Sequence, residues 1–160
     1  MSMISVTLPD GSVNEYSAGI TAGEIVIDIE GRKHECIAAM VDGSQSDFST
    51  VLESDCSVEG ISGFSDEGIH IMRHSAAHLL AQAVTTLYPD AKPTIGLAID
   101  RGFYYDFANL EDFGESDLKG VQKKMHEIAR RNISVERVEC SEAELGEMFS
   151  STPYKMEIIN

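Results

Sequence analysis

Apolar and polar residues alternate at residues 4–8 with the two-residue period of a β-strand. This alternation, a turn at 9–12 and a return strand at 13–16 predict a β-hairpin. Thr21 and Glu24 have the spacing of a capping box, which predicts a short helix ending at Gly31. Further strands are predicted at 36–41, 51–52 and 56–58, with a tight turn at Asp42-Gly43.

The element order β-β-α-β-β predicts a small ubiquitin-like β-grasp domain over residues 1–62. Residues 63–68 are rich in Gly, Ser and acidic side chains, which is typical of a linker. A second domain of mixed helices and strands is then expected over residues 69–160. The predicted fold class of the chain is therefore α+β.

The second domain begins with a long apolar run, residues 69–87, that predicts one helix. Strands are predicted at 94–99, 103–107, 133–138 and 154–159, a helix capped by Ser116, and another opened by the Ser141/Glu144 capping box. The sequence stops inside the last apolar strand, and we therefore expect it to be part of a longer protein.

The bulk properties exclude several classes of protein. A net charge of −15 disfavours independent, non-specific binding to nucleic acid. The charged run 119–131 is accordingly interpreted as a solvated helix face rather than an RNA-binding patch. Three scattered cysteines, no signal peptide and no membrane-length apolar run lead us to expect a cytoplasmic protein with reduced thiols.

The candidate chemistry lies in the helix at 69–87, where His74 and His78 are four residues apart and share one helix face. Two such imidazoles can share a substrate, a proton or a metal, although packed or solvated structural histidines are about equally common. A zinc site is the weaker interpretation, because Ser75 stands where a protease-type helix needs Glu and no third ligand is evident. We expect no metal and no cofactor.

Several short signatures surround this pair. They are Val6-Thr7-Leu8-Pro9-Asp10-Gly11-Ser12, Arg73-His74-Ser75-Ala76-Ala77-His78-Leu79-Leu80, Ile95-Gly96, Gly102-Phe103-Tyr104-Tyr105-Asp106 and Tyr154-Lys155. In this order the whole chain resembles the N-terminal portion of bacterial-type threonyl-tRNA synthetases. The resemblance implies a TGS domain at 1–62 and the first part of a tRNA editing domain at 69–160.

The resemblance also implies a function. Members of this family ligate threonine to its tRNA with ATP and hydrolyse mischarged seryl-tRNA at a second site. His74 and His78 match the editing-pocket HxxxH motif, Lys155 matches a pocket lysine, and these three are the expected catalytic residues. Tyr105, preferred over Tyr104, and Asp106 are the expected substrate-binding residues. The expected partner is tRNA.

The sequence departs from the family pattern at Leu97, where proline is usual, and at Ala76, where cysteine is frequent. The downstream CxxxH motif, the catalytic core and the anticodon-binding domain of the family are absent from this sequence. The resemblance implies that the catalytic core holds ATP, magnesium and zinc and forms the homodimer. We therefore expect a monomer that neither activates threonine nor edits efficiently. The alternatives are a free-standing trans-editing hydrolase and a TGS-containing regulatory module.

Overall fold

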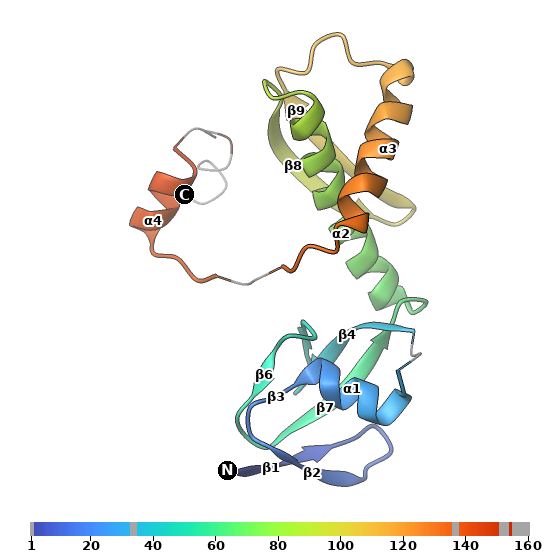
Figure 1. Ribbon diagram of the computed structural model, residues 1–160, viewed down its shortest axis with the longest axis vertical. Coiled ribbons are helices and arrows are strands. Elements are labelled where there is room, and N and C mark those ends of the chain that lie inside the picture. Colours follow the sequence, from blue (N-terminus) through green and yellow to red (C-terminus); the bar gives the residue numbers. More distant parts are fainter. Residues whose placement is uncertain (1, 33–34, 136–137, 151–153, 155–160) are drawn as a thin grey trace. The chain divides into compact units, whose positions relative to one another are not determined.

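The computed structural model describes residues 2–32, 35–135, 138–150 and 154. The chain forms two compact units, Met1–Met72 and Arg73–Asn160 (Figure 1). The boundary lies inside a helix, ten residues beyond the end of the predicted β-grasp domain. Each unit is built from its own elements and has its own hydrophobic core.

The first unit is a five-stranded sheet in the order β2-β1-β7-β4-β5, with a separate pair β3-β6. Its strands are β1 (Met3–Thr7), β2 (Val13–Ser17), β3 (Ile20–Thr21), β4 (Cys36–Val41), β5 (Ser44–Ser46), β6 (Val51–Leu52) and β7 (Cys56–Ser62). The predicted hairpin is confirmed as the antiparallel pair β1–β2. The sequence analysis missed β3 and β5, and it ended β7 four residues early.

Helix α1 (Ala22–Glu30) begins and ends where its capping residues predict. The Thr21 hydroxyl accepts a hydrogen bond from the Glu24 backbone N–H, and the Glu24 carboxylate accepts one from the Thr21 N–H at 2.9 Å. These bonds satisfy N–H groups that a helix start leaves without partners. Because the Thr21 N–H and hydroxyl donate to it, the pKa of Glu24 is lowered. At the other end Gly31 takes a positive φ of 81°.

The core of the first unit lies where α1 packs against β4 and β7. Every second residue of β1 is buried, and these side chains meet the apolar face of α1. The buried members are Ile4, Val6, Ala22, Ile25, Val26, Ala39, Leu52 and Val58. The two sequence periods, two in the strand and about 3.6 in the helix, thus converge on one core.

The predicted linker is shorter in the structure than in the sequence analysis. Strand β7 continues to Ser62 and helix α2 (Asp66–Leu87) begins at Asp66, so only three residues separate them. The Gly63 N–H donates to the Glu35 carbonyl, and Gly68 is packed so closely on Ser62 that a Cβ would collide with it. These contacts hold the first turns of α2 to the first unit.

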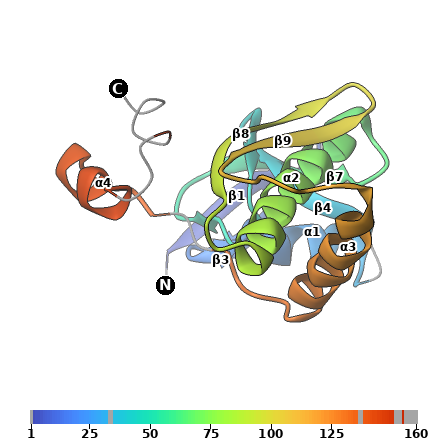
Figure 2. The same ribbon diagram turned by 90° about the horizontal axis from the view of Figure 1, so that it is seen from above.

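In the second unit, α2 lies between a β-hairpin and helix α3 (Glu115–Arg130), as Figures 1 and 2 show. The hairpin consists of β8 (Lys92–Ile99) and β9 (Gly102–Ala108), which confirms both predicted strands. The core contains Ala83, Val84, Ala91, Val121 and Ile128, with Phe107 packed against it. The helix predicted at 69–87 is therefore confirmed as one element.

Helix α3 begins two residues earlier than predicted. Its N-cap is Gly114 rather than Ser116, because the Asp117 carboxylate reaches back to the Gly114 N–H at 2.9 Å. The Tyr88 hydroxyl donates to the same carboxylate at 3.0 Å. Both bonds lower the pKa of Asp117, the Gly114 N–H having the larger effect.

The predicted strand at 133–138 is wrong for its described residues, which are in no strand. Ile133 and Val135 have the two-residue spacing of one strand face, but no neighbouring strand pairs with them among the described residues. The Ser141 capping box is confirmed and opens α4 (Glu142–Met148). In the stretch 154–159 only Tyr154 is described, and it is not in a strand.

Two features of the composition can be compared with the structure. Cys36, Cys56 and Cys140 are all free, in agreement with the expected reduced thiols. Among the described residues, none of the helices is both long enough and apolar enough to span a membrane.

Candidate functional site

Helix α2 brings the two predicted histidines into direct contact. The Nε2 atoms of His74 and His78 lie 3.0 Å apart, and their rings meet edge to face with centroids 4.6 Å apart. Both residues are exposed to solvent. The spacing of four residues alone predicts a shared face, and the structure adds that the two ring nitrogens face each other.

A contact between two ring nitrogens requires one to donate and the other to accept. One ring must therefore carry its proton on Nε2 while the other presents a lone pair there. If both rings were protonated, two N–H groups would point at each other and the contact would break. The ring that donates from Nε2 then keeps its lone pair on Nδ1, where it can take a proton from water or return one to a leaving group.

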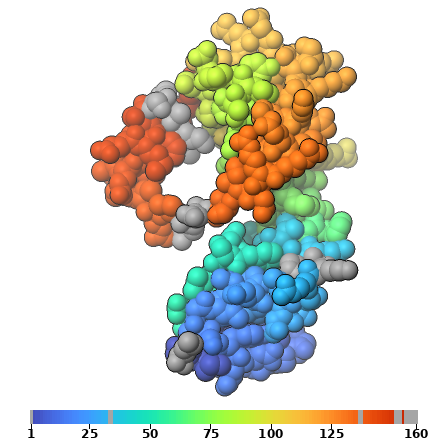
Figure 3. Space-filling view, viewed as in Figure 1, coloured from blue at the N-terminus to red at the C-terminus, as the bar shows by residue number. Residues whose placement is uncertain are grey.

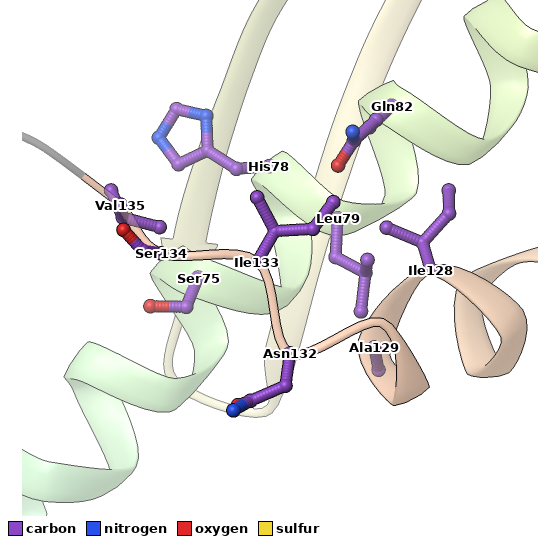
Figure 4. Close-up of a pocket in the computed structure, with 10 residues that line it drawn as sticks. All are labelled: Ser75, His78, Leu79, Gln82, Ile128, Ala129, Asn132, Ile133, Ser134 and Val135. Atoms are coloured by element: carbon purple, nitrogen blue, oxygen red, sulfur yellow. The ribbon is translucent and has the colours of Figure 1, made fainter.

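An open groove of about 710 Å³ lies beside His78 (Figure 4). One wall is a face of α2, and the other is the end of α3 with the segment that follows it. The lining residues are Ser75, His78, Leu79, Gln82, Ile128, Ala129, Asn132, Ile133, Ser134 and Val135. Its surface is mainly apolar with a few polar side chains, the usual character of a small-molecule site.

Arg73 ties the start of this site to the hairpin. Its guanidinium Nη1 donates to the carbonyl of Asp100 at 2.8 Å and to that of Ile99 at 3.2 Å. Ile99 is the last residue of β8, and Asp100 follows it in the β8–β9 turn. The two bonds therefore hold the helical turn of α2 that carries His74 against the end of the hairpin. Arg73 therefore positions the histidine turn, a role that the sequence analysis did not assign.

Tyr105 and Asp106 lie on opposite faces of β9. The ring of Tyr105 covers Gly96 on β8 so closely that a Cβ there would collide with it, and it lies 5.2 Å from the ring of Phe107. Asp106 is exposed on the other face, and its carbonyl accepts a hydrogen bond from the Thr94 hydroxyl. Because neighbours along a strand point in opposite directions, both side chains cannot face one pocket from this strand.

Of the four predicted site residues that the structure describes, the groove contains one, His78. His74 touches His78 but does not line the groove, and Tyr105 and Asp106 do not line it either. Lys155 lies outside the described residues. Within the described part of the chain, no group of three or more His, Cys, Asp or Glu side chains is arranged to hold a metal ion.

The sequence analysis missed most of the groove. Ser75, Leu79 and Gln82 recur with His78 at helical spacing, so a helical-wheel projection of α2 would have identified this wall. The opposite wall, residues 132–135, has no such signal. Its alternation was interpreted as a strand, and only the packing of α3 on α2 brings it to the groove.

A family model for the TGS domain matches residues 4–61. This range agrees with the predicted β-grasp domain and ends within β7, one residue before the strand does. The match covers the sheet and α1 but not the histidine helix. The first unit is thus accounted for by one family, and the second unit requires another comparison.

A comparison of the whole chain with curated proteins covers the second unit as well. The chain is 44% identical to a threonine--tRNA ligase of Pelobacter propionicus over 100% of the chain and 26% of that relative. It is 42% identical to one of Burkholderia cenocepacia over 98% of the chain, and 38% identical to one of Staphylococcus carnosus over 100% of the chain, with 25% of each relative covered. The chain thus spans about a quarter of the length of the curated relatives that it matches. Its residues 4–61 are a TGS domain, and along its whole length it is similar to the N-terminal region of threonine--tRNA ligases.

Proposed function

We propose that this chain serves in a threonine--tRNA ligase, an enzyme that uses ATP to join threonine to its tRNA. Within that enzyme, the chain supplies the TGS domain and the histidine helix of a site that hydrolyses mischarged seryl-tRNA. The observation that carries the proposal is the identity of 38–44% along the chain, histidine helix included. The similarity extends across both units and so argues against a free-standing TGS module.

The chemical need for such a site follows from the two amino acids. Serine differs from threonine by one missing methyl group, and a binding pocket gains only about 1–3 kcal/mol of discrimination from such a difference. A synthetic site that selects threonine therefore also accepts some serine. A second site that hydrolyses the wrong product restores accuracy.

The geometry of the histidine pair supports a role in this hydrolysis. The ring that donates from Nε2 has its free lone pair on Nδ1, which can accept a proton from the attacking water while the 3.0 Å contact with the other ring orients it. The groove beside His78 offers a mainly apolar surface for part of the substrate. The roles of Lys155 as a third catalytic residue and of Tyr105 and Asp106 in substrate binding stay predictions.

The test is the double variant His74→Ala/His78→Ala in the complete ligase. Threonine activation should be unchanged, because we place the ATP site outside this chain. Hydrolysis of seryl-tRNA should fall by about 10²–10⁴-fold, the usual effect of losing positioned acid–base groups. His70→Ala is the matched control, since His70 is exposed one turn earlier on α2. Unchanged editing together with a lowered melting temperature would show that the pair is only structural.

We further propose that the pair holds no metal ion. Two imidazoles supply too few ligands for a stable zinc site, and their Nε2 atoms contact each other. The purified chain should contain no stoichiometric zinc by elemental analysis. One tightly bound zinc per chain, lost in His78→Ala, would contradict the proposal.

The remaining proposals concern partners and location. We infer that tRNA is the macromolecular partner, that the chain alone is a monomer, and that it acts in the cytoplasm. Dimer formation is assigned to the catalytic core of the complete enzyme. Light scattering on the purified chain should give a mass near 17.5 kDa, and twice that mass would place a dimer interface within these residues.

A further inference from the structure

The basic residues of this acidic chain are concentrated on one helix. Five of its twelve Lys and Arg residues fall within residues 119–131, which contain a single carboxylate, that of Glu127. This stretch carries a formal charge of +4, whereas the rest of the chain carries −19. A polyanion that approaches the protein is therefore repelled by most of the surface and attracted by this helix.

The structure divides these charges between two faces of α3. Lys124 and Arg131 both pair with Glu127, at 2.7 and 2.8 Å. The two bonds lower the pKa of Glu127, Lys124 having the larger effect. This face is internally neutralised to a large extent, as a solvated helix face would be.

The other face carries Lys119, Lys123 and Arg130, with His126 between them; we call these four residues the basic stripe. At 100° per residue they fall within about 60° around the helix axis, and at 1.5 Å per residue they extend over about 16 Å. All four are exposed. Within the described part of the chain, the ion pairs of α3 involve none of them.

Burial explains why the stripe faces solvent. Val121 and Ile128 are the buried residues of α3 and lie on roughly the opposite side of its axis. In the space-filling view α3, drawn in orange, lies at the surface of the second unit (Figure 3). A shallow hollow of about 560 Å³ is lined by Lys119, Gln122, Lys123, His126, Glu127 and Arg130.

We propose that the basic stripe binds the phosphate backbone of base-paired RNA. Lys and Arg side chains spaced along one helix face can contact several successive phosphates, which fix position without reading sequence. The hollow contains no aromatic or aliphatic anchor, the feature on which protein interfaces depend most. No Phe, Tyr or Trp occurs in α3 to stack on unpaired bases, so a duplex fits better than a single strand.

The stripe gives a new meaning to the charged run 119–131. The sequence analysis interpreted that run as a solvated helix face rather than an RNA-binding patch. Among the described residues, the structure separates a side whose charges pair with Glu127 from the basic stripe, whose charges form no ion pair within α3. Identifying the RNA as tRNA rests on the proposed function. The phosphate-binding surface itself rests only on the charges and the geometry of α3.

The experiment is an NMR titration of the ¹⁵N-labelled chain with a short RNA duplex of arbitrary sequence at low salt. Amide shifts should change mainly within residues 115–131. The affinity should fall steeply with salt, as expected when phosphate contacts release counterions. Absence of binding at millimolar duplex, or shift changes centred on another element, would overturn the proposal. So would equal shift changes with poly-glutamate at matched charge, because they would indicate a general anion or protein surface.

A pair of matched variants isolates the stripe. Lys119→Gln/Lys123→Gln should weaken duplex binding at least about tenfold and reduce the slope of log affinity against log salt by about two. Arg32→Gln/Arg101→Gln removes the same charge from two exposed positions off the helix, and it should leave both quantities nearly unchanged. Equal losses in both variants would show that net charge alone is responsible. Neither result depends on seryl-tRNA hydrolysis, so failure here leaves the editing test intact.

Discussion

The two units of this protein use their apolar residues differently. The first buries a core of eight side chains that are at most 5% exposed, and the second buries a smaller core of five side chains within the same limit. Among its described residues, the second unit has a two-stranded sheet whose outer face leaves Ile95, Leu97 and Ile99 between 44% and 50% exposed. A two-stranded sheet is marginal in isolation and depends on the elements that pack against it.

The difference separates stability from chemistry. In the first unit, the sheet and helix α1 bury each other's apolar faces. The second unit carries the histidine pair, the groove beside His78 and the basic stripe, all on α2 and α3. Rigid helices are suitable supports for a site, whereas the sparse sheet beside them leaves surface open. The predictions that follow test this division.

The largest expected effect is on the core of the first unit. Ile25 is fully buried, and Ile25→Ala should lower the free energy of unfolding by about 2–5 kcal/mol. Leu97→Ala, at a residue 47% exposed, should change it far less. Chemical denaturation followed residue by residue by NMR would assign each loss to its unit. Equal losses would contradict the difference between the buried core of the first unit and the exposed outer face of the β8–β9 hairpin.

The next largest effect is expected where Gly96 packs closely against the Tyr105 ring in the second unit. Gly96→Ala places a Cβ against the ring of Tyr105, and the overpacking should cost about 1–3 kcal/mol. Gly102→Ala is the matched control, because nothing lies near its added Cβ and its φ is not positive. Thermal melts of both variants measure the difference. A neutral Gly96→Ala would mean that the Tyr105 ring moves aside at no cost.

Helix caps give a smaller and more selective effect. Thr21→Ala removes the cap of α1, which contributes Ala22, Ile25 and Val26 to the buried core, and should cost about 1 kcal/mol. Ser141→Ala removes an equivalent capping box from α4, which buries no residue. Its loss should reduce helicity without shifting the global melt. Circular dichroism and a melting curve on each variant distinguish the two outcomes.

The smallest effect is a dependence on pH. The pKa of Glu24 is lower in the folded chain than its usual value of 4.5, because Thr21 donates to its carboxylate. Its contribution is therefore present above about pH 4.5 and is lost as the pH falls through the lower folded pKa. Acid titration of stability should show a shallower decline in Glu24→Gln than in the parent chain. Identical declines in stability at low pH in the two chains would mean that the Glu24 carboxylate does not contribute to the stability of the fold.

Local chemistry made the first unit largely predictable. Thr21 and Glu24 mark the start of α1 by side-chain bonds that span three residues, and Asp42-Gly43 makes its turn with the positive φ values of 47° and 76° that the pair favours. The alternation of β1 identifies its buried face. None of these features needs a distant residue, so the sequence was sufficient to predict them.

Predictions failed where a residue's state depends on a remote partner. Residues 133–135 alternate like a strand but have no strand to pair with, and instead line the groove. Ser116 is a good capping residue, yet Asp117, whose carboxylate also accepts a hydrogen bond from the distant Tyr88 hydroxyl, reaches Gly114 and moves the start of α3. Strand pairing and cap choice are competitions between alternatives, and the packing of the rest of the unit decides them.

The candidate site divides in the same way. The spacing of His74 and His78 on an apolar run was enough to place both on one face of α2, because helical periodicity is local. That Tyr105 and Asp106 diverge was also implicit in the strand. The sequence could not reveal which wall closes the groove, or that Arg73 holds the histidine turn through two carbonyls of the hairpin. Local periodicity determined which side chains share a face of each helix or strand. Only the packing of elements far apart in the chain decided which other residues each face contacts.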